Sequence, residues 1–254
     1  MTSPFDTLPV TYDDFSAIPF RTHLETPSVL RALGDLRGAK ALDLGCGSGF
    51  YTRLLRHRGA ARVTGIDIST GMIAHARAEE TARPLGVDYL LGDGTLPDHL
   101  AGTFDLVLGV YVLPYATTLA ELRQLCTTAA RALRPGGRFV TLPMHPDVRA
   151  GTISYAPYGF ELTAAGPPAD ASPVLLHLRF PGHAPEAVTA YYWSRDTLEG
   201  ALREAGFARP RWTELTVAEP GVAAHGEAYW HDYLAHPHTV IADCRTSRPT
   251  GAPA

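Results

Sequence analysis

An aspartate stands just before a run of alternating glycines in the stretch ALDLGCGSGF, residues 41–50. Gly45, Gly47 and Gly49 would let a ligand approach the backbone where the next helix begins. A pyrophosphate about 4 Å from Asp43 would cost on the order of 1 to 4 kcal/mol, at effective dielectric constants between those of water and a protein surface. The same carboxylate would stabilise an ammonium group by a similar amount. The stretch therefore favours a ligand that carries a positive amine where a dinucleotide carries phosphate.

Two further aspartates end the next two predicted strands, in RVTGIDI and in VDYLLGD. Asp67 can accept hydrogen bonds from both hydroxyl groups of a ribose, and Asp93, beside Gly94, can accept one from the amino group of adenine. Each acid alone is explained equally well as a turn residue after a strand. Three acids after three successive strands favour a nucleoside site, and the common nucleoside with a positive amine is S-adenosylmethionine.

The segments that must position these acids alternate short apolar runs with helical patterns, which is typical of parallel strands joined by crossover helices. The predicted strands are residues 39–44, 62–68, 87–91, 104–112 and 137–142, and the predicted helices are 26–36, 69–82 and 119–133. Thr26 and Ser69 are the expected N-caps of the first two helices. Further along, we predict strands at 174–180, 186–194, 211–217 and 239–244 and a helix at 195–206.

The chain of 254 residues is expected to form a single domain. We expect it to comprise an N-terminal cap segment (1–38), a cofactor-binding core (39–142), a lid or substrate insertion (143–193), the end of the sheet (194–246) and a mobile tail (247–254).

The composition argues against several kinds of partner. The formal net charge is -4 and no Lys/Arg run occurs, so we expect no nucleic acid. No apolar run could cross a bilayer and MTSPFDTLPV does not resemble a signal peptide, so we expect a cytoplasmic protein that binds no membrane. Cys46, Cys126 and Cys244 lie far apart and no histidines have zinc-binding spacing, so we expect no disulfide and no metal. We expect a monomer or a homodimer.

The motifs LDLGCGSG, GIDIS, GDG, FDLVLGVYVL and LRPGGRFV resemble those of the class I S-adenosylmethionine-dependent methyltransferases. The resemblance implies an α/β, Rossmann-like fold: a doubly wound, mostly parallel sheet of seven strands, reversed at 239–244, with a small insertion after the fifth strand. It also implies the cofactor-binding residues. Asp43, Gly45, Gly47 and Gly49 would line the methionine end, Asp67 and Ile68 the ribose, Asp93 and Gly94 the adenine, Met72 the adenine face, and Val110 the sulfonium. Met72 is explained nearly as well as an ordinary core methionine.

Four longer stretches, YDDFSAIPFR, ISYAPYGFEL, YYWSRDTLEGALREAGF and EAYWHDYLAHP, are similar to the toxoflavin-biosynthesis type of small-molecule methyltransferase. This resemblance implies that the N-terminal segment folds over the cofactor, with Tyr12 and Arg21 at the methionine end and Tyr12 as a candidate catalytic residue. It also implies N-methylation of a heteroaromatic ring, such as an azapteridine, in bacterial secondary metabolism or antibiotic biosynthesis.

Aromatic residues gather in the second half of the chain, where some could stack on a flat acceptor, although about half of them are expected in the core. The expected acceptor-binding residues are Tyr111, Tyr158, Trp193, Trp230 and His231. His145, after the fifth predicted strand, is the first candidate for a general base. It is explained at least as well as a loop histidine that only forms hydrogen bonds.

Three alternatives stay open. The first is O- or C-methylation of a phenol, carboxylate or keto acid. The second is an NAD(P)-dependent oxidoreductase, which is disfavoured by Asp43 and by Phe50 at the place of the third glycine in G-x-G-x-x-G. The third is a module that binds S-adenosylmethionine without transferring its methyl group.

Overall fold

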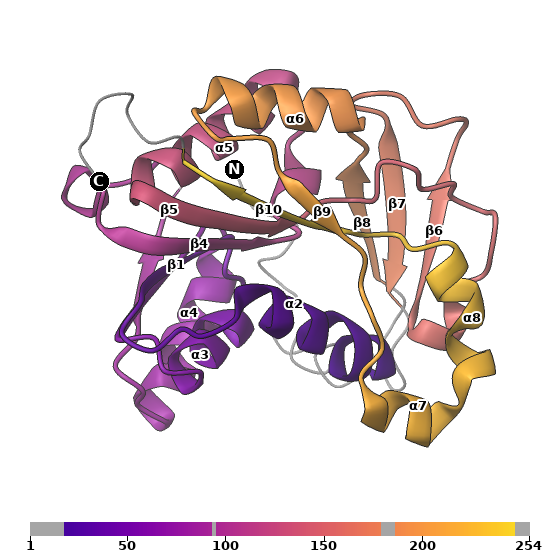
Figure 1. Ribbon diagram of the computed structural model, residues 1–254, viewed down its shortest axis with the longest axis horizontal. Helices are drawn as coiled ribbons and strands as arrows, with labels where there is room; N and C mark the ends of the chain where they lie inside the picture. Colours follow the sequence, from indigo (N-terminus) through magenta and orange to yellow (C-terminus); the bar gives the residue numbers. More distant parts are fainter. Residues whose placement is uncertain (1–17, 93–94, 179–185, 247–254) are drawn as a thin grey trace.

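The computed structural model describes residues 18–92, 95–178 and 186–246. Its main sheet has seven strands in the order β3-β2-β1-β4-β5-β10-β9 (Figure 1). The strands are β1 (Lys40–Leu44), β2 (Arg62–Asp67), β3 (Asp88–Leu91), β4 (Phe104–Val110), β5 (Leu133–Leu142), β9 (Arg211–Thr213) and β10 (Ile241–Arg245). The strands from β3 to β5 pair in parallel, whereas β10 runs antiparallel to both β5 and β9. The predicted doubly wound sheet with one reversed strand is confirmed.

Helices cover both faces of this sheet (Figure 1). They are α2 (Thr26–Leu33), α3 (Phe50–His57), α4 (Thr70–Ala82), α5 (Leu119–Ala132) and α6 (Arg195–Glu204). The first three place Val29, Leu55 and Ile73 in one core cluster, and α5 and α6 place Leu122 and Leu198 in a second cluster. The apolar stripes predicted from helical spacing therefore face the core.

The two predicted helix caps have different outcomes. Ser69 is the N-cap of α4, where its hydroxyl accepts a hydrogen bond from the backbone N–H of Met72 at 3.2 Å. The cap at Thr26 is wrong, because a π-helical turn, η1 (Arg21–Glu25), continues directly into α2. Arg21 and Glu25 are spaced to pair along one helix face, and their ion pair at 2.8 Å spans this turn.

A second, antiparallel sheet follows β5, where the sequence predicted an insertion. Its strands β6 (Phe160–Ala164), β7 (Pro173–Leu178) and β8 (Glu186–Tyr191) pair in that order. The sequence pattern predicts β7 and β8 but not β6. Because β8 contacts the turn η3 (Leu113–Tyr115), which follows β4, the small sheet lies at the carboxyl end of that strand.

Two short helices, α7 (Glu219–His225) and α8 (Glu227–Ala235), come between β9 and β10 and were not predicted. Helix α7 contacts the turn η1, and α8 buries Trp230 and Tyr233. Neither helix is long enough to show a sustained apolar stripe. None of the helices in the described part of the chain has the length and apolar character that a bilayer crossing requires.

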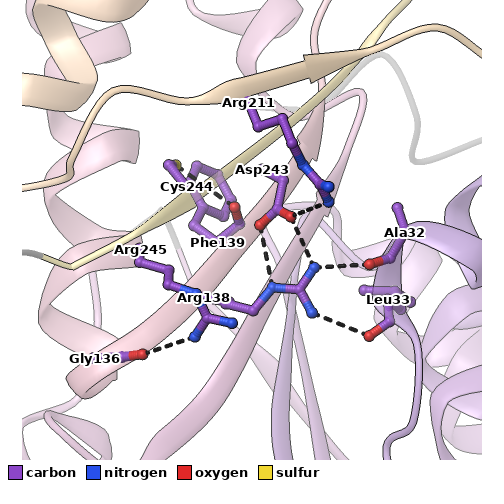
Figure 2. Close-up of polar contacts among 9 residues, drawn as sticks. All are labelled: Ala32, Leu33, Gly136, Arg138, Phe139, Arg211, Asp243, Cys244 and Arg245. Atoms are coloured by element: carbon purple, nitrogen blue, oxygen red, sulfur yellow. Dashed lines mark hydrogen bonds and ion pairs between the residues drawn. The ribbon is translucent and has the colours of Figure 1, made fainter.

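The end of α2 is fastened to the sheet by Arg138, which lies on β5 (Figure 2). The Arg138 guanidinium donates to the carbonyl oxygens of Ala32 at 2.7 Å and Leu33 at 3.1 Å, which are among the last carbonyls of the helix. It also pairs with Asp243 on β10 at 2.9 Å, and Arg211 contacts the same carboxylate at 3.1 Å. Arg138 therefore connects the end of α2 to β10, and the other end of α2 continues from the turn η1.

Candidate functional site

The loop between β1 and α3 needs its glycines. Gly45, Gly47 and Gly49 have φ angles of 73°, 52° and 85°, in the left-handed region that side chains disfavour. A Cβ atom on Gly49 would also lie 2.3 Å from the hydroxyl oxygen of Tyr89. These three positions therefore require glycine for the conformation of the loop at the start of α3.

Asp67 at the end of β2 holds this loop in place. One carboxylate oxygen accepts from the backbone N–H of Gly47 at 2.8 Å, and the other accepts from the backbone N–H of Ser69 at 2.8 Å. Asp67 therefore fixes the glycine loop to the end of β2.

Asp43 is a buried carboxylate, 2% exposed, at the inner end of the same loop. Its Oδ2 accepts from the Thr52 hydroxyl at 2.7 Å. Burial, together with the nearby Asp67 charge, raises the pKa of Asp43 to about 7, although the Thr52 hydrogen bond and Arg53 act in the opposite direction. A ligand ammonium group would stabilise the ionised form, so this acid fits the positive amine of S-adenosylmethionine.

Apolar side chains are exposed where β2 and β3 end. Ile68 is 63% exposed and Leu91 is 51% exposed, and Leu91 pairs with Asp67 in the sheet. A flat adenine ring covering these side chains would remove apolar surface from water. Of the other expected cofactor residues, Val110 is partly buried at the end of β4, whereas Met72 is buried in the core under α4.

Three expected residues, Tyr12, Asp93 and Gly94, lie outside the described residues. Arg21 is described and is buried in a polar cluster with Glu25.

That cluster joins three elements of the fold. Glu25 has no exposed surface and accepts hydrogen bonds from the hydroxyls of Tyr51 at 2.8 Å and Tyr111 at 2.5 Å. The Arg21 guanidinium pairs with the same carboxylate and lies over the ring of Phe50, 5.1 Å from its centroid. Burial and the adjacent Glu25 charge raise the pKa of Tyr111 well above its usual range, so this phenol stays protonated and donates a hydrogen bond to Glu25. The cluster thus links η1 with α3 and with the end of β4.

A cavity of about 50 Å³ lies between the carboxyl ends of β4 and β5 and the small sheet. Its lining residues are Tyr111, Pro114, Tyr115, Met144, Phe160, Leu162, Leu176, Ala190 and His238. The lining is apolar except for two phenols and one imidazole. Of the expected acceptor-binding residues, Tyr111 alone is among those that line this cavity.

Two of the other expected residues belong to the core. Tyr158 stacks on Trp230, with ring centroids 5.9 Å apart, and its hydroxyl donates to the Tyr229 carbonyl at 2.6 Å. The Trp230 indole N–H donates to the Gly221 carbonyl at 3.0 Å. Trp230 thus joins α8 to α7, Tyr158 joins α8 to the turn before β6, and neither side chain lines the cavity.

The remaining expected residues also lie away from the cavity lining. Trp193 is buried in the second core cluster beside α6, and His231 is exposed on α8. His145 is buried with both ring nitrogens engaged: Nε2 lies 3.1 Å from a Glu214 carboxylate oxygen, and Nδ1 accepts from the backbone N–H of Asp147 at 3.0 Å. His145 therefore has the environment of a hydrogen-bonding loop histidine.

The sequence interpretation placed neither His238 nor Glu25 at the site. The stretch 225–238, which ends at His238, is rich in histidines without zinc-binding spacing, and no sequence signal near Glu25 indicates its burial. Among the described residues no group of His, Cys, Asp and Glu side chains could hold a metal ion.

Comparisons with known proteins agree with this geometry. Residues 42–141 match the model of the family described as "Methyltransferase domain". The chain is 34% identical over 220 residues to nocamycin O-methyltransferase from Saccharothrix syringae, covering 82% of this chain and 72% of that protein. It is 31% identical over 140 residues to ubiquinone biosynthesis O-methyltransferase from Nitrosococcus oceani, a match that covers 54% of this chain and 58% of that relative.

The fold is also shared with solved structures. An amino pentose methyltransferase from Micromonospora echinaspora, solved with S-adenosylmethionine bound, superposes with a TM-score of 0.61 at 20% identity and covers 94% of this chain and 95% of its own. The cofactor is S-adenosylmethionine, which sets the oxidoreductase alternative aside. The chain belongs to the class I S-adenosylmethionine-dependent methyltransferases.

Proposed function

We propose that this enzyme methylates a ring nitrogen of a small, planar heteroaromatic compound, such as an azapteridine, held in the cavity beside β4 and β5. The observation that carries the proposal is the position of Tyr111. Its ring lines the aromatic cavity, while its hydroxyl joins the Glu25 cluster that reaches α3 behind the glycine loop. One residue thus connects the acceptor side with the cofactor side.

Bound S-adenosylmethionine supplies a methyl group on a sulfonium, which is transferred in line to the acceptor. Such a displacement requires alignment and exclusion of water more than a strong base. In this proposal Asp43 receives the positive amine, Asp67 the ribose hydroxyls, and Ile68 with Leu91 the adenine ring. Tyr12, Asp93, Gly94 and Val110 keep the roles that the family resemblance implies.

Arg21 has a more specific part in the proposal. Its ion pair with Glu25 and its position over the Phe50 ring fix the orientation of the guanidinium near the start of α3. A fixed guanidinium at this place would attract the cofactor's carboxylate. Tyr111 and Glu25 would keep the N-terminal helix closed over the cofactor.

O-methylation is the second candidate, because the nocamycin and ubiquinone relatives are both named O-methyltransferases. The two outcomes are separated by incubating the enzyme with S-adenosylmethionine carrying a 13C-labelled methyl group. An azapteridine and hydroxylated and keto analogues of the same ring size would each be supplied as acceptor. NMR of each product would then show which atom carries the new methyl group. Label on a ring nitrogen supports the proposal, and label only on oxygen supports the second candidate.

A further inference from the structure

His238 contributes the one imidazole of the cavity lining and lies in the loop before β10. Aromatic rings fix its orientation. The ring of Phe160 lies 4.6 Å away between centroids, and Tyr111 stacks on it at 6.0 Å with an angle of 24°. Tyr155 meets it edge to face at 6.0 Å. The imidazole therefore has a defined position on the cavity wall.

The hydrogen bond to Tyr233 determines which nitrogen carries the proton. His238 Nδ1 lies 2.9 Å from the hydroxyl oxygen of Tyr233, which is fully buried. If Nδ1–H donated to this oxygen, the phenol proton would have no acceptor within the described residues, at a cost of about 1–3 kcal/mol. If the phenol donates to Nδ1, both groups are satisfied. The favoured tautomer therefore has its proton on Nε2, and no described residue accepts a hydrogen bond from that atom.

The surroundings keep this ring uncharged. In the described part of the chain, the titratable groups packed against it are the phenols of Tyr111, Tyr155 and Tyr233, and no carboxylate contacts it. The backbone N–H of His145 donates to its carbonyl at 2.8 Å. Burial, with a smaller effect from His145, lowers the pKa of His238 to about 3.

We propose that His238 binds the methyl acceptor through Nε2–H, as a hydrogen-bond donor to a ring nitrogen or carbonyl oxygen beside the methylated atom. This inference rests on the proposed function and narrows it. An uncharged acceptor with such a lone pair satisfies Nε2–H. A carboxylate or an ammonium group would leave its charge among apolar side chains without a counter-ion, which is costly.

The tautomer of His238 can be tested without any methyl transfer. Nitrogen NMR of the imidazoles, in the protein saturated with S-adenosylhomocysteine, should show His238 neutral and protonated on Nε2 from pH 5 to 8. In Tyr233→Phe the preference for Nε2–H should weaken. A proton on Nδ1 in the wild type, or a titration of His238 near pH 6.5, would overturn the proposal.

The donor role is tested with small probes. Pyridazine, an uncharged ring with two nitrogen lone pairs, should shift the His238 Nε2–H proton signal in the same protein. Benzene, a ring of the same size without lone pairs, should leave it unchanged. Equal shifts with both probes, or no shift with pyridazine at saturating concentration, would count against the donor role. A pyridazine-dependent shift without methyl transfer to any heteroaromatic acceptor would contradict the proposed function alone.

Kinetics with an identified acceptor separate binding from a structural effect. His238→Phe keeps a flat ring but loses the donor, so KM for the acceptor should rise about 3- to 10-fold, as expected for one hydrogen bond. His238→Gln places an amide N–H near the position of Nε2 and should restore most of the affinity. An equal loss in both variants, or a fall in kcat with KM unchanged, would contradict the role.

Discussion

The affinity for the cofactor should depend on pH through Asp43. In the free protein, burial raises the pKa of this carboxyl to about 7. A bound ammonium group favours the ionised form, so binding at lower pH must first remove a proton from Asp43. We therefore expect S-adenosylhomocysteine to bind more weakly as pH falls below 7. The ligand's own α-amino group remains protonated in this range, since such groups titrate near pH 8.

The size of the effect follows from the fraction of Asp43 that is ionised. With a pKa of about 7, half of the free protein is ionised at pH 7 and about 3% at pH 5.5. If Asp43 is fully ionised in the complex, the dissociation constant should rise about 16-fold over this interval, which corresponds to about 1.6 kcal/mol. Calorimetry at pH 5.5, 6.0, 6.5 and 7.0 would measure it. At pH 6, titrations in two buffers of different ionisation enthalpy should show release of about 0.9 proton.

Asp43→Asn is the matched control, because its amide oxygen can still accept from Thr52. The variant should bind at least about fivefold more weakly at pH 7 and lose most of the pH dependence. The stability of the variant gives a second test. The folded pKa of Asp43 lies above its unfolded value of 3.8, so the contribution of Asp43 to wild-type stability is lost as pH rises from about 4 to 7. The melting temperature of the variant should therefore rise relative to that of the wild type over the same increase in pH. A pH dependence of binding that is the same in both proteins would refute the assignment of Asp43.

Three further perturbations test the arrangement of the site. Asp67→Ala removes the acceptor of the Gly47 and Ser69 backbone N–H groups and of the proposed ribose hydroxyls. Cofactor affinity measured by calorimetry should fall more than tenfold, and an unchanged affinity would contradict the ribose role. Gly49→Ala places a Cβ atom against the Tyr89 hydroxyl at a left-handed backbone position, so both the melting temperature and the cofactor affinity should fall. Wild-type values of both quantities would contradict this loop geometry. Arg138→Met removes the hydrogen bonds that fasten α2 and should destabilise the protein by about 2 kcal/mol. Hydrogen exchange should become faster in residues 26–33, and an equal acceleration throughout the chain would show that the effect is not local.

The sequence by itself determined the main sheet and the places of the glycine loop and of two strand-end acids in it. Strands β1 to β5 and the helices between them are each marked by a local apolar pattern. Asp43 and Asp67 end consecutive parallel strands, so their meeting at one edge of the sheet follows from the chain order. The glycine loop is equally local, because its function depends on backbone angles within a few residues.

Only the tertiary structure decided which residues line the cavity that we propose for the acceptor. The cavity combines the turn after β4, the end of β5, all three strands of the small sheet and the loop before β10, which are far apart in the chain. No spacing rule distinguishes an aromatic residue that fills the core, as Trp230 does, from one that faces a cavity, as Tyr111 does. The same holds for His145 and His238. The difference between them lies in which partners occupy their ring nitrogens, and those partners are brought together by packing.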